Sequence, residues 1–76
     1  MISMSLVRVD MDFILSNLRA SYGMTVDGSA VPAEQRKRLV TLSVENVSPN
    51  GLLDAIAAET GTTWTMESGA VVFRPK

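Results

Sequence analysis

Cysteine and histidine are both missing from this chain of 76 residues. The absence of cysteine excludes disulfides and thiolate metal sites. The absence of histidine removes the commonest metal ligand and the commonest general base. Each acidic residue already has a predicted place at a helix cap, on a helix face or in a loop. We therefore expect no catalytic site, no metal site and no cofactor, and we interpret the chain as a protein that is not an enzyme.

Strong net charge and long apolar runs are also absent. The formal net charge is −1, so no general attraction draws the chain to nucleic acid or to an anionic membrane. No apolar run approaches the roughly 20 residues that are needed to cross a bilayer. The first four residues are too short and too uncharged for a signal peptide, although a trimmed secreted protein would look the same. The length predicts a single small domain over residues 1–76.

The clearest pattern in the chain is a helix over residues 48–61 with both ends marked. Ser48 is a good N-cap, because its hydroxyl can accept a hydrogen bond from a free N–H of the first turn. Pro49 fits the first helical position, where its missing N–H leaves nothing unsatisfied. Gly61 fits the C-terminal position that requires a positive φ. The predicted buried stripe is Leu52, Leu53, Ile56 and Ala57.

An earlier segment, residues 10–23, has the same plan. Asp10 takes the place of Ser48 as the cap, and Gly23 takes the place of Gly61 as the stop. The predicted buried stripe is Met11, Ile14, Leu15, Leu18 and Tyr22. The flanks correspond as well, with Val9 matching Val47. The sequence therefore predicts an internal repeat of strand, helix and strand.

The remaining patterns complete an α+β order of β-α-β-β-α-β-β. Strands are predicted over 2–9, 24–26, 39–44, 62–66 and 70–73, with a turn at 67–69 closing a terminal hairpin. A loop is predicted from Asp27 to about Arg38. The two helices are expected to pack on mixed sheet, which gives a small two-layer sandwich. Trp64 is expected to be the main apolar anchor of the core, and Gly51 either permits a close approach or is merely tolerated.

Four residues are candidates for contact with a partner. Phe13 falls off the buried stripe of its helix, so its ring either offers a contact or folds over a neighbouring edge. Arg36, Lys37 and Arg38 form a basic cluster in the predicted loop. Such a cluster is typical of a phosphate or nucleic-acid contact or of a solvated loop that protects a sheet edge. The second interpretation is favoured, because no aromatic residue stands among the charges to stack on a base.

Most of the chain resembles the short N-terminal domain of secretins and of signalling TonB-dependent receptors. The resemblance is carried by residues 9–18 leading to Gly23, by residues 40–47 ("VTLSVENV"), by residues 52–56 leading to Thr60-Gly61, and by residues 69–75. It departs from the family pattern at Asn50-Gly51, where acidic helix formers are usual. The connection over 28–38 is longer than in many secretins and closer to the receptor branch, while residues 40–47 are closer to the secretin branch.

The resemblance implies a non-catalytic, periplasmic adaptor that is part of an outer-membrane protein. In secretins such a domain lies at the periplasmic entrance of a ring-shaped channel and meets inner-membrane components. In receptors it hands a signal to an anti-sigma regulator. The expected partner is thus a protein of the cell envelope, with a ring of copies in the parent protein and no small-molecule substrate. A small nucleic-acid-binding module is the remaining alternative.

Overall fold

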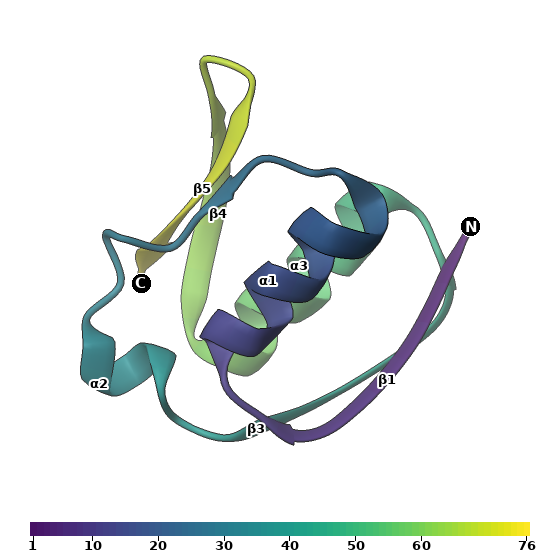
Figure 1. Ribbon diagram of the computed structural model, residues 1–76, viewed down its shortest axis with the longest axis horizontal. Helices are drawn as coiled ribbons and strands as arrows, with labels where there is room; N and C mark the ends of the chain where they lie inside the picture. Colours follow the sequence, from purple (N-terminus) through teal and green to yellow (C-terminus); the bar gives the residue numbers. More distant parts are fainter.

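Eight elements follow one another in the computed structural model, which describes all residues from 1 to 76 (Figure 1). They are β1 (Ile2–Val9), α1 (Met11–Tyr22), β2 (Val26–Asp27), α2 (Ala33–Arg36), β3 (Val40–Val47), α3 (Pro49–Thr60), β4 (Thr62–Glu67) and β5 (Ala70–Pro75). The predicted order of strands and long helices is confirmed. The short helix α2 is new, because it lies inside the stretch that was predicted as a loop.

Helix α2 is a single turn, and this explains why the sequence pattern missed it. The N–H of Arg36 donates to the carbonyl of Pro32 at 3.0 Å, and the N–H of Lys37 donates to that of Ala33 at 3.0 Å. Four residues are too few to show a 3.6-residue apolar period. None of the residues of α2 is buried, so no apolar stripe could have revealed it.

Both long helices have the ends that the sequence predicted. The Asp10 carboxylate accepts from the N–H of Phe13 at 2.8 Å, and the Ser48 hydroxyl accepts from the N–H of Gly51 at 3.1 Å. Gly23 and Gly61 close the two helices in the left-handed conformation, with φ of 62° and 69°. An L side chain is strained there, whereas glycine is not.

The strands form two separate sheets, which confirms an α+β fold with the helices packed on sheet. Strand β1 pairs antiparallel with β3 in one sheet. The other sheet has the order β2-β5-β4, with β2 parallel to β5 and β4 antiparallel to it. In Figure 1 the two sheets lie on opposite sides of α1 and α3. Strand β2 is shorter than the predicted strand over 24–26, while β3 and β5 extend beyond their predicted ends.

The core consists of 13 buried hydrophobic residues that come from every element except β1, α2 and β4. The predicted stripes of both long helices are buried, with one exception. Tyr22 is 42% exposed, because it is the last residue of α1 and its hydroxyl stays in water. Phe73 of β5 is fully buried, whereas Trp64 is only half-buried. The expectation that Trp64 is the main apolar anchor is therefore wrong.

Trp64 instead packs at the margin of the core, where its polar atom has a partner. Its indole N–H donates to the carboxylate of Asp54 on α3 at 2.8 Å. The indole N–H of this half-buried side chain is thus satisfied by an acceptor on the exposed face of α3. No buried side-chain nitrogen or oxygen atom of the molecule lacks a hydrogen-bond partner.

Candidate interaction surfaces

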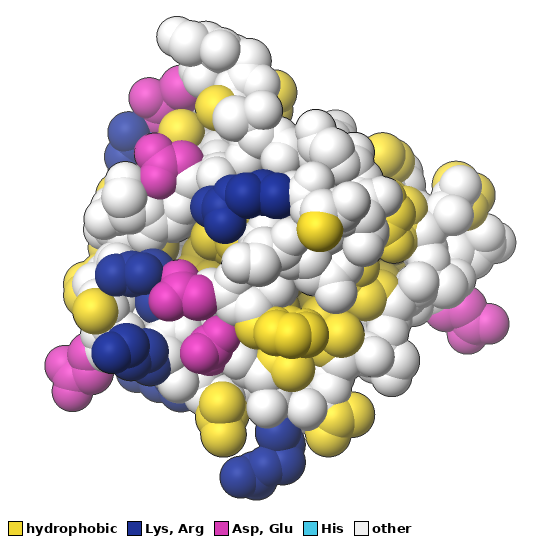
Figure 2. Space-filling view, in the orientation of Figure 1, with side chains coloured by type: hydrophobic (Ala, Val, Ile, Leu, Met, Phe, Trp, Pro, Cys, Tyr) yellow, Lys and Arg dark blue, Asp and Glu magenta, His cyan; other side chains and the backbone are white.

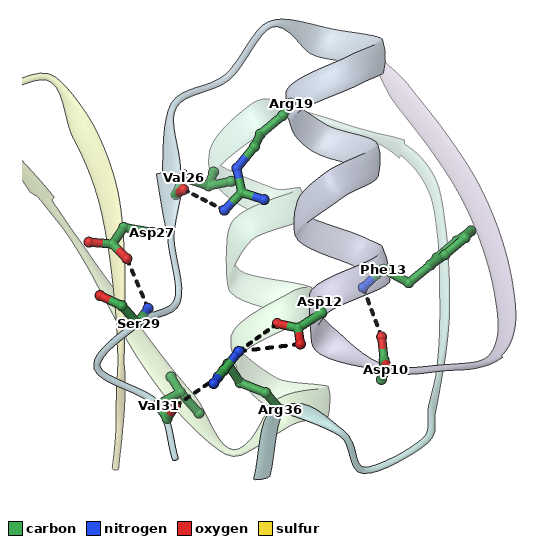
Figure 3. Close-up of polar contacts among 9 residues, drawn as sticks. All are labelled: Asp10, Asp12, Phe13, Arg19, Val26, Asp27, Ser29, Val31 and Arg36. Atoms are coloured by element: carbon green, nitrogen blue, oxygen red, sulfur yellow. Dashed lines mark hydrogen bonds and ion pairs between the residues drawn. The ribbon is translucent and has the colours of Figure 1, made fainter. Parts of the chain in front are cut away.

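The predicted basic cluster is divided by the fold. The Arg36 guanidinium donates from Nη1 to the two carboxylate oxygens of Asp12 at 3.0 and 3.3 Å, and from Nε to the carbonyl of Val31 at 2.9 Å (Figure 3). Arg36 therefore ties α2 to the first turn of α1. Lys37 and Arg38 are exposed and form no ion pair. Only these two cations of the cluster point to solvent without a partner in the chain.

A second tether, which the sequence did not reveal, joins α2 to α3. The Gln35 side-chain amide donates to the carbonyls of Thr60 and Gly61 at 2.8 and 3.1 Å. These carbonyls lie at the C-terminal end of α3, where backbone acceptors have no partner within the helix. An isolated glutamine in a polar stretch gives no signal for such a contact. The segment around α2 is thus held against both long helices.

Phe13 presents its ring on the surface of the molecule. The side chain is 50% exposed, and in Figure 3 it points away from α1 on the side where β1 runs. Figure 2 shows hydrophobic side chains in a band on this face, over the region between α1 and β1 and toward the N-terminal end. Arg36 contacts Asp12, whose side chain points away from the Phe13 ring in Figure 3. The four candidate residues therefore do not form one site.

Strand β1 is an edge strand with little covering. It has a single sheet neighbour, β3. Its inward-facing side chains, Ile2, Met4, Leu6 and Val9, pack against the core but stay only partly buried. Across the sheet, Leu42 is 1% exposed although it lies directly opposite Leu6. Val40, Val44 and Val47 of β3 are also only partly buried, so both strands of this sheet lie at the margin of the core.

The outer face of the β1–β3 sheet carries small hydroxyl side chains. A shallow hollow on it is lined by Ser3, Met4, Ser5, Ser43, Val44 and Glu45. Ser5 lies directly opposite Ser43 in the register. The Ser3 hydroxyl accepts from the N–H of Asn46 at 3.0 Å. The hollow thus combines small hydroxyl groups with the apolar side chains of Met4 and Val44.

The acidic side chains with a lowered pKa lie around the terminal hairpin. Hydrogen bonds from Arg74, and then from Thr65, hold the pKa of Glu67 below its ordinary value. The pKa of Asp27 is lowered mainly because the N–H of Ser29 donates to its carboxylate at 2.8 Å. The pKa of Arg74 is raised by its hydrogen bond to Glu67. These exposed interactions fasten the hairpin and the turn after β2, and they have a structural explanation.

No group of three or more acidic side chains is placed to hold a metal ion together. None of the three helices has the length and apolar character that crossing a membrane requires. Comparison with protein-family models, with curated proteins and with solved structures finds no match to this chain.

Proposed function

We propose that this chain is a protein-binding domain of a cell-envelope protein, of the kind found at the N-terminus of secretins, and that it performs no catalysis. In this proposal the domain lies in the periplasm as part of an outer-membrane channel for secretion or pilus assembly. Its partner is an inner-membrane component of the same machinery. The domain contributes a docking surface, and the parent protein assembles as a ring.

The observation that carries the proposal is the order of the elements together with the two glycine-closed helices. The segments that resemble the family fall on regular elements: Val40-Thr41-Leu42 on β3, Leu52-Leu53 on the buried side of α3, and Gly69 at the turn of the β4–β5 hairpin. A correspondence that follows the whole chain supports the family more than any single motif would. It concerns the fold, so the function remains a proposal that rests on it.

The distribution of surface features also favours binding over chemistry. Open sheet edges and an exposed aromatic ring are features that recognise other chains. The lowered pKa of Asp27 is explained by the backbone N–H of Ser29, and that of Glu67 by the side chains of Arg74 and Thr65. What the molecule presents to solvent is therefore suited to contact with another protein.

Site-specific crosslinking in the periplasm tests this function. The chain, with a photo-reactive residue in place of Val7 or of Phe13, is exported in its source organism, and the crosslinked proteins are identified by mass spectrometry. The proposal expects one inner-membrane protein of an envelope assembly to recur at the same position. Glu34, on the far side of the molecule at α2, provides the control position. Products that are the same at all positions, or that are cytoplasmic after cell lysis, would contradict the proposal.

The signalling domain of a TonB-dependent receptor is the second candidate, and one observation favours it. The connection over 28–38 is long and contains α2, which the hydrogen bonds of Gln35 and Arg36 hold in place. In that case the partner is an anti-sigma regulator. The residues that follow Lys76 in the parent gene distinguish the two: a plug and barrel indicate a receptor, and further small α/β domains indicate a secretin. Nucleic acid binding has less support, because Arg36 is engaged with Asp12.

A further inference from the structure

The stretch Lys37-Arg38-Leu39 joins α2 to β3 and lies outside every helix and strand. All three residues are exposed, and Leu39 is 53% exposed although it is apolar. Neither Lys37 nor Arg38 forms an ion pair. A free basic side chain beside an accessible peptide bond is what proteases of trypsin-like specificity recognise, and exposed connections are where such enzymes usually cut.

The segment before this stretch can open without unfolding the domain. Cleavage acts on a locally opened chain, so α2 must unwind first. Helix α2 has four residues, none of them buried, and a single helical turn is not stable on its own. It lies at the margin of the molecule (Figure 1) and is held by hydrogen bonds from Gln35 to Thr60 and Gly61 and from Arg36 to Asp12. Local opening therefore costs less than global unfolding.

The other arginines outside this connection lie in more strongly held elements. Arg19 is inside α1, which buries four residues, and its guanidinium donates to the carbonyl of Val26 at 2.9 Å. Arg74 belongs to β5, the middle strand of its sheet, and is paired with Glu67. Arg8 is exposed but belongs to β1, whose pairing with β3 would have to open. Cleavage at any of these requires the loss of a long helix or of sheet pairing.

The stretch 37–39 also divides the chain between its two repeats. Strands β1 and β2 precede it, whereas β3, β4 and β5 follow it, so both sheets take strands from each side. The N–H of Val71 donates to the carbonyl of Thr25 at 2.9 Å, and that of Asn46 to the Ser3 hydroxyl at 3.0 Å. Helices α1 and α3 both contribute to the single core. A cut at this place leaves the contacts that join the two repeats intact.

We propose that the peptide bond between Arg38 and Leu39 is a processing site for proteases that cut after basic residues, and that the cut chain persists as a two-chain domain. Hydrolysis adds one water molecule across this bond. The carbonyl carbon of Arg38 gains the hydroxyl group, and the nitrogen of Leu39 gains the protons, which gives a carboxylate and an ammonium group. The protease supplies the catalytic groups. This inference does not depend on the envelope function proposed above.

Limited digestion of the intact chain with trypsin tests the position of the cut. The products are followed over time by mass spectrometry at a low ratio of protease to chain. We expect fragments 1–38 and 39–76 to appear before any product of a cut after Arg8, Arg19 or Arg74. A double variant, Lys37→Gln with Arg38→Gln, should lose the intact chain about tenfold more slowly, because the opened segment no longer offers these basic side chains.

A matched variant controls for the loss of one exposed arginine. Arg8→Gln removes a side chain that is exposed and free of ion pairs, like that of Arg38. It should leave the rate and the position of the first cut unchanged. Circular dichroism of both variants confirms that they keep the fold, as expected for substitutions at exposed positions.

The cut product tests the second half of the inference. Once an inhibitor has stopped the protease, both fragments should elute together in size-exclusion chromatography at the volume of the uncut chain. The uncut chain should have a Tm that does not depend on its concentration. The Tm of the cut product should rise with concentration, because its two chains separate when they unfold.

Several outcomes would overturn the inference. It fails if the first cut falls after Arg8, Arg19 or Arg74, or if the double variant is cut as fast as the original chain. It also fails if the fragments elute separately or lose their circular dichroism signal. A Tm of the cut product that stays constant over a hundredfold range of concentration would contradict the two-chain domain as well.

Discussion

Residues 2–27 and residues 40–65 build the same unit twice, yet only α3 packs closely on both strands of its unit, whereas α1 packs mainly on β2. Each unit has a strand of eight residues, a helix of twelve and a second strand. The correspondence extends to the backbone just before each helix. Arg8 and Asn46 occupy equivalent positions, and both have a positive φ, 55° and 57°. The β-bulges that they mark turn the chain from each strand into its helix.

The register of the β1–β3 sheet has the symmetry that a duplication predicts. Met4 lies opposite Val44, and Leu6 lies opposite Leu42. Exchanging the two repeats converts one of these pairs into the other, because Leu6 corresponds to Val44 and Met4 to Leu42. Ser5 lies opposite Ser43, its own counterpart, so a pseudo-twofold axis passes between them. The sheet is thus the interface between two copies of one unit.

The symmetry ends after the second strand of each unit. In the first unit the chain leaves β2 and forms α2, which Arg36 and Gln35 fasten to the helices. In the second unit it turns back as β5, which enters between β2 and β4. Strand β4 gains a full antiparallel partner, whereas β2 gains only two parallel pairs. The two units therefore share their local sequence pattern but have different surroundings, because a different segment follows each of them.

The largest effect should come from equivalent core positions, where we expect the two units to behave alike. Leu18 and Ile56 correspond, and both are fully buried. Leu18→Ala and Ile56→Ala should each lower the free energy of unfolding by about 3 kcal/mol, because each leaves a cavity. Chemical denaturation followed by circular dichroism measures this loss.

Valine substitutions at the same two positions, and substitutions at two exposed positions, provide the controls for this pair. Leu18→Val and Ile56→Val should each lose about 1 kcal/mol and keep the protein folded if the alanine variants unfold. Ala20→Ser and Ala58→Ser change equivalent exposed positions and should alter stability by less than about 0.5 kcal/mol. A loss at one core position less than half that at the other would show that the units do not share the core equally.

The two glycines that end the helices should differ slightly. Gly23→Ala should lower the free energy of unfolding by about 1 kcal/mol, because an L residue is strained at positive φ. Gly61→Ala should lower it further, since the new Cβ would lie 3.4 Å from the Gln35 side-chain amide that bonds the end of α3. Thermal unfolding of both variants, with asparagine variants as less strained controls, measures the difference. Equal losses would mean that the added Cβ does not disturb the hydrogen bonds from Gln35.

The features that could be predicted from the sequence are those that depend on residues close together in the chain. Caps such as Ser48, stops such as Gly61 and the apolar periods of both helices each depend on a few positions, so they fix the elements and the repeat. The division into two sheets, by contrast, depends on β5 entering between β2 and β4. That pairing joins segments far apart in the chain, and no local pattern specifies it.

The candidate surface was predictable only in part, for the same reason. Phe13 stood off the helical stripe and was visible as a candidate. Arg36 was grouped with Lys37 and Arg38 because they are adjacent in sequence, and its bond to Asp12 could be seen only in the fold. Gly51 corresponds to Phe13, and the close contact that a Cβ there would make with Val47 at 3.3 Å is visible only in the fold.

The two β-bulges, at Arg8 and Asn46, allow a smaller test, in which the residue at one position is replaced by the residue at the equivalent position of the other unit. Arg8→Asn should raise the free energy of unfolding by up to about 1 kcal/mol, because asparagine tolerates positive φ better than arginine. Asn46→Arg should lower it by a similar amount. Urea denaturation of the two variants and of the double exchange measures the effects. If Arg8→Asn is destabilising, then Arg8 makes a contact that outweighs its backbone strain.

The smallest effect concerns the one hairpin that has no counterpart in the first unit. The hydrogen bond from Arg74 lowers the pKa of Glu67 below its ordinary value of 4.5, so the folded hairpin binds this proton less readily than the unfolded chain. The stabilisation is therefore complete above about pH 4.5 and disappears as the pH falls through the lowered pKa. Protection of the hairpin amides from exchange should decrease over the same range.

Asp27, which lies in the first unit at the position that corresponds to Thr65, provides the internal control. Its pKa is also lowered, but chiefly by the N–H of Ser29 and only slightly by Arg74. In Arg74→Gln, a carboxyl NMR titration should show the pKa of Glu67 rising toward 4.5 while that of Asp27 changes much less. If both carboxyls move together, the two act as one electrostatic cluster that links β2 to the hairpin.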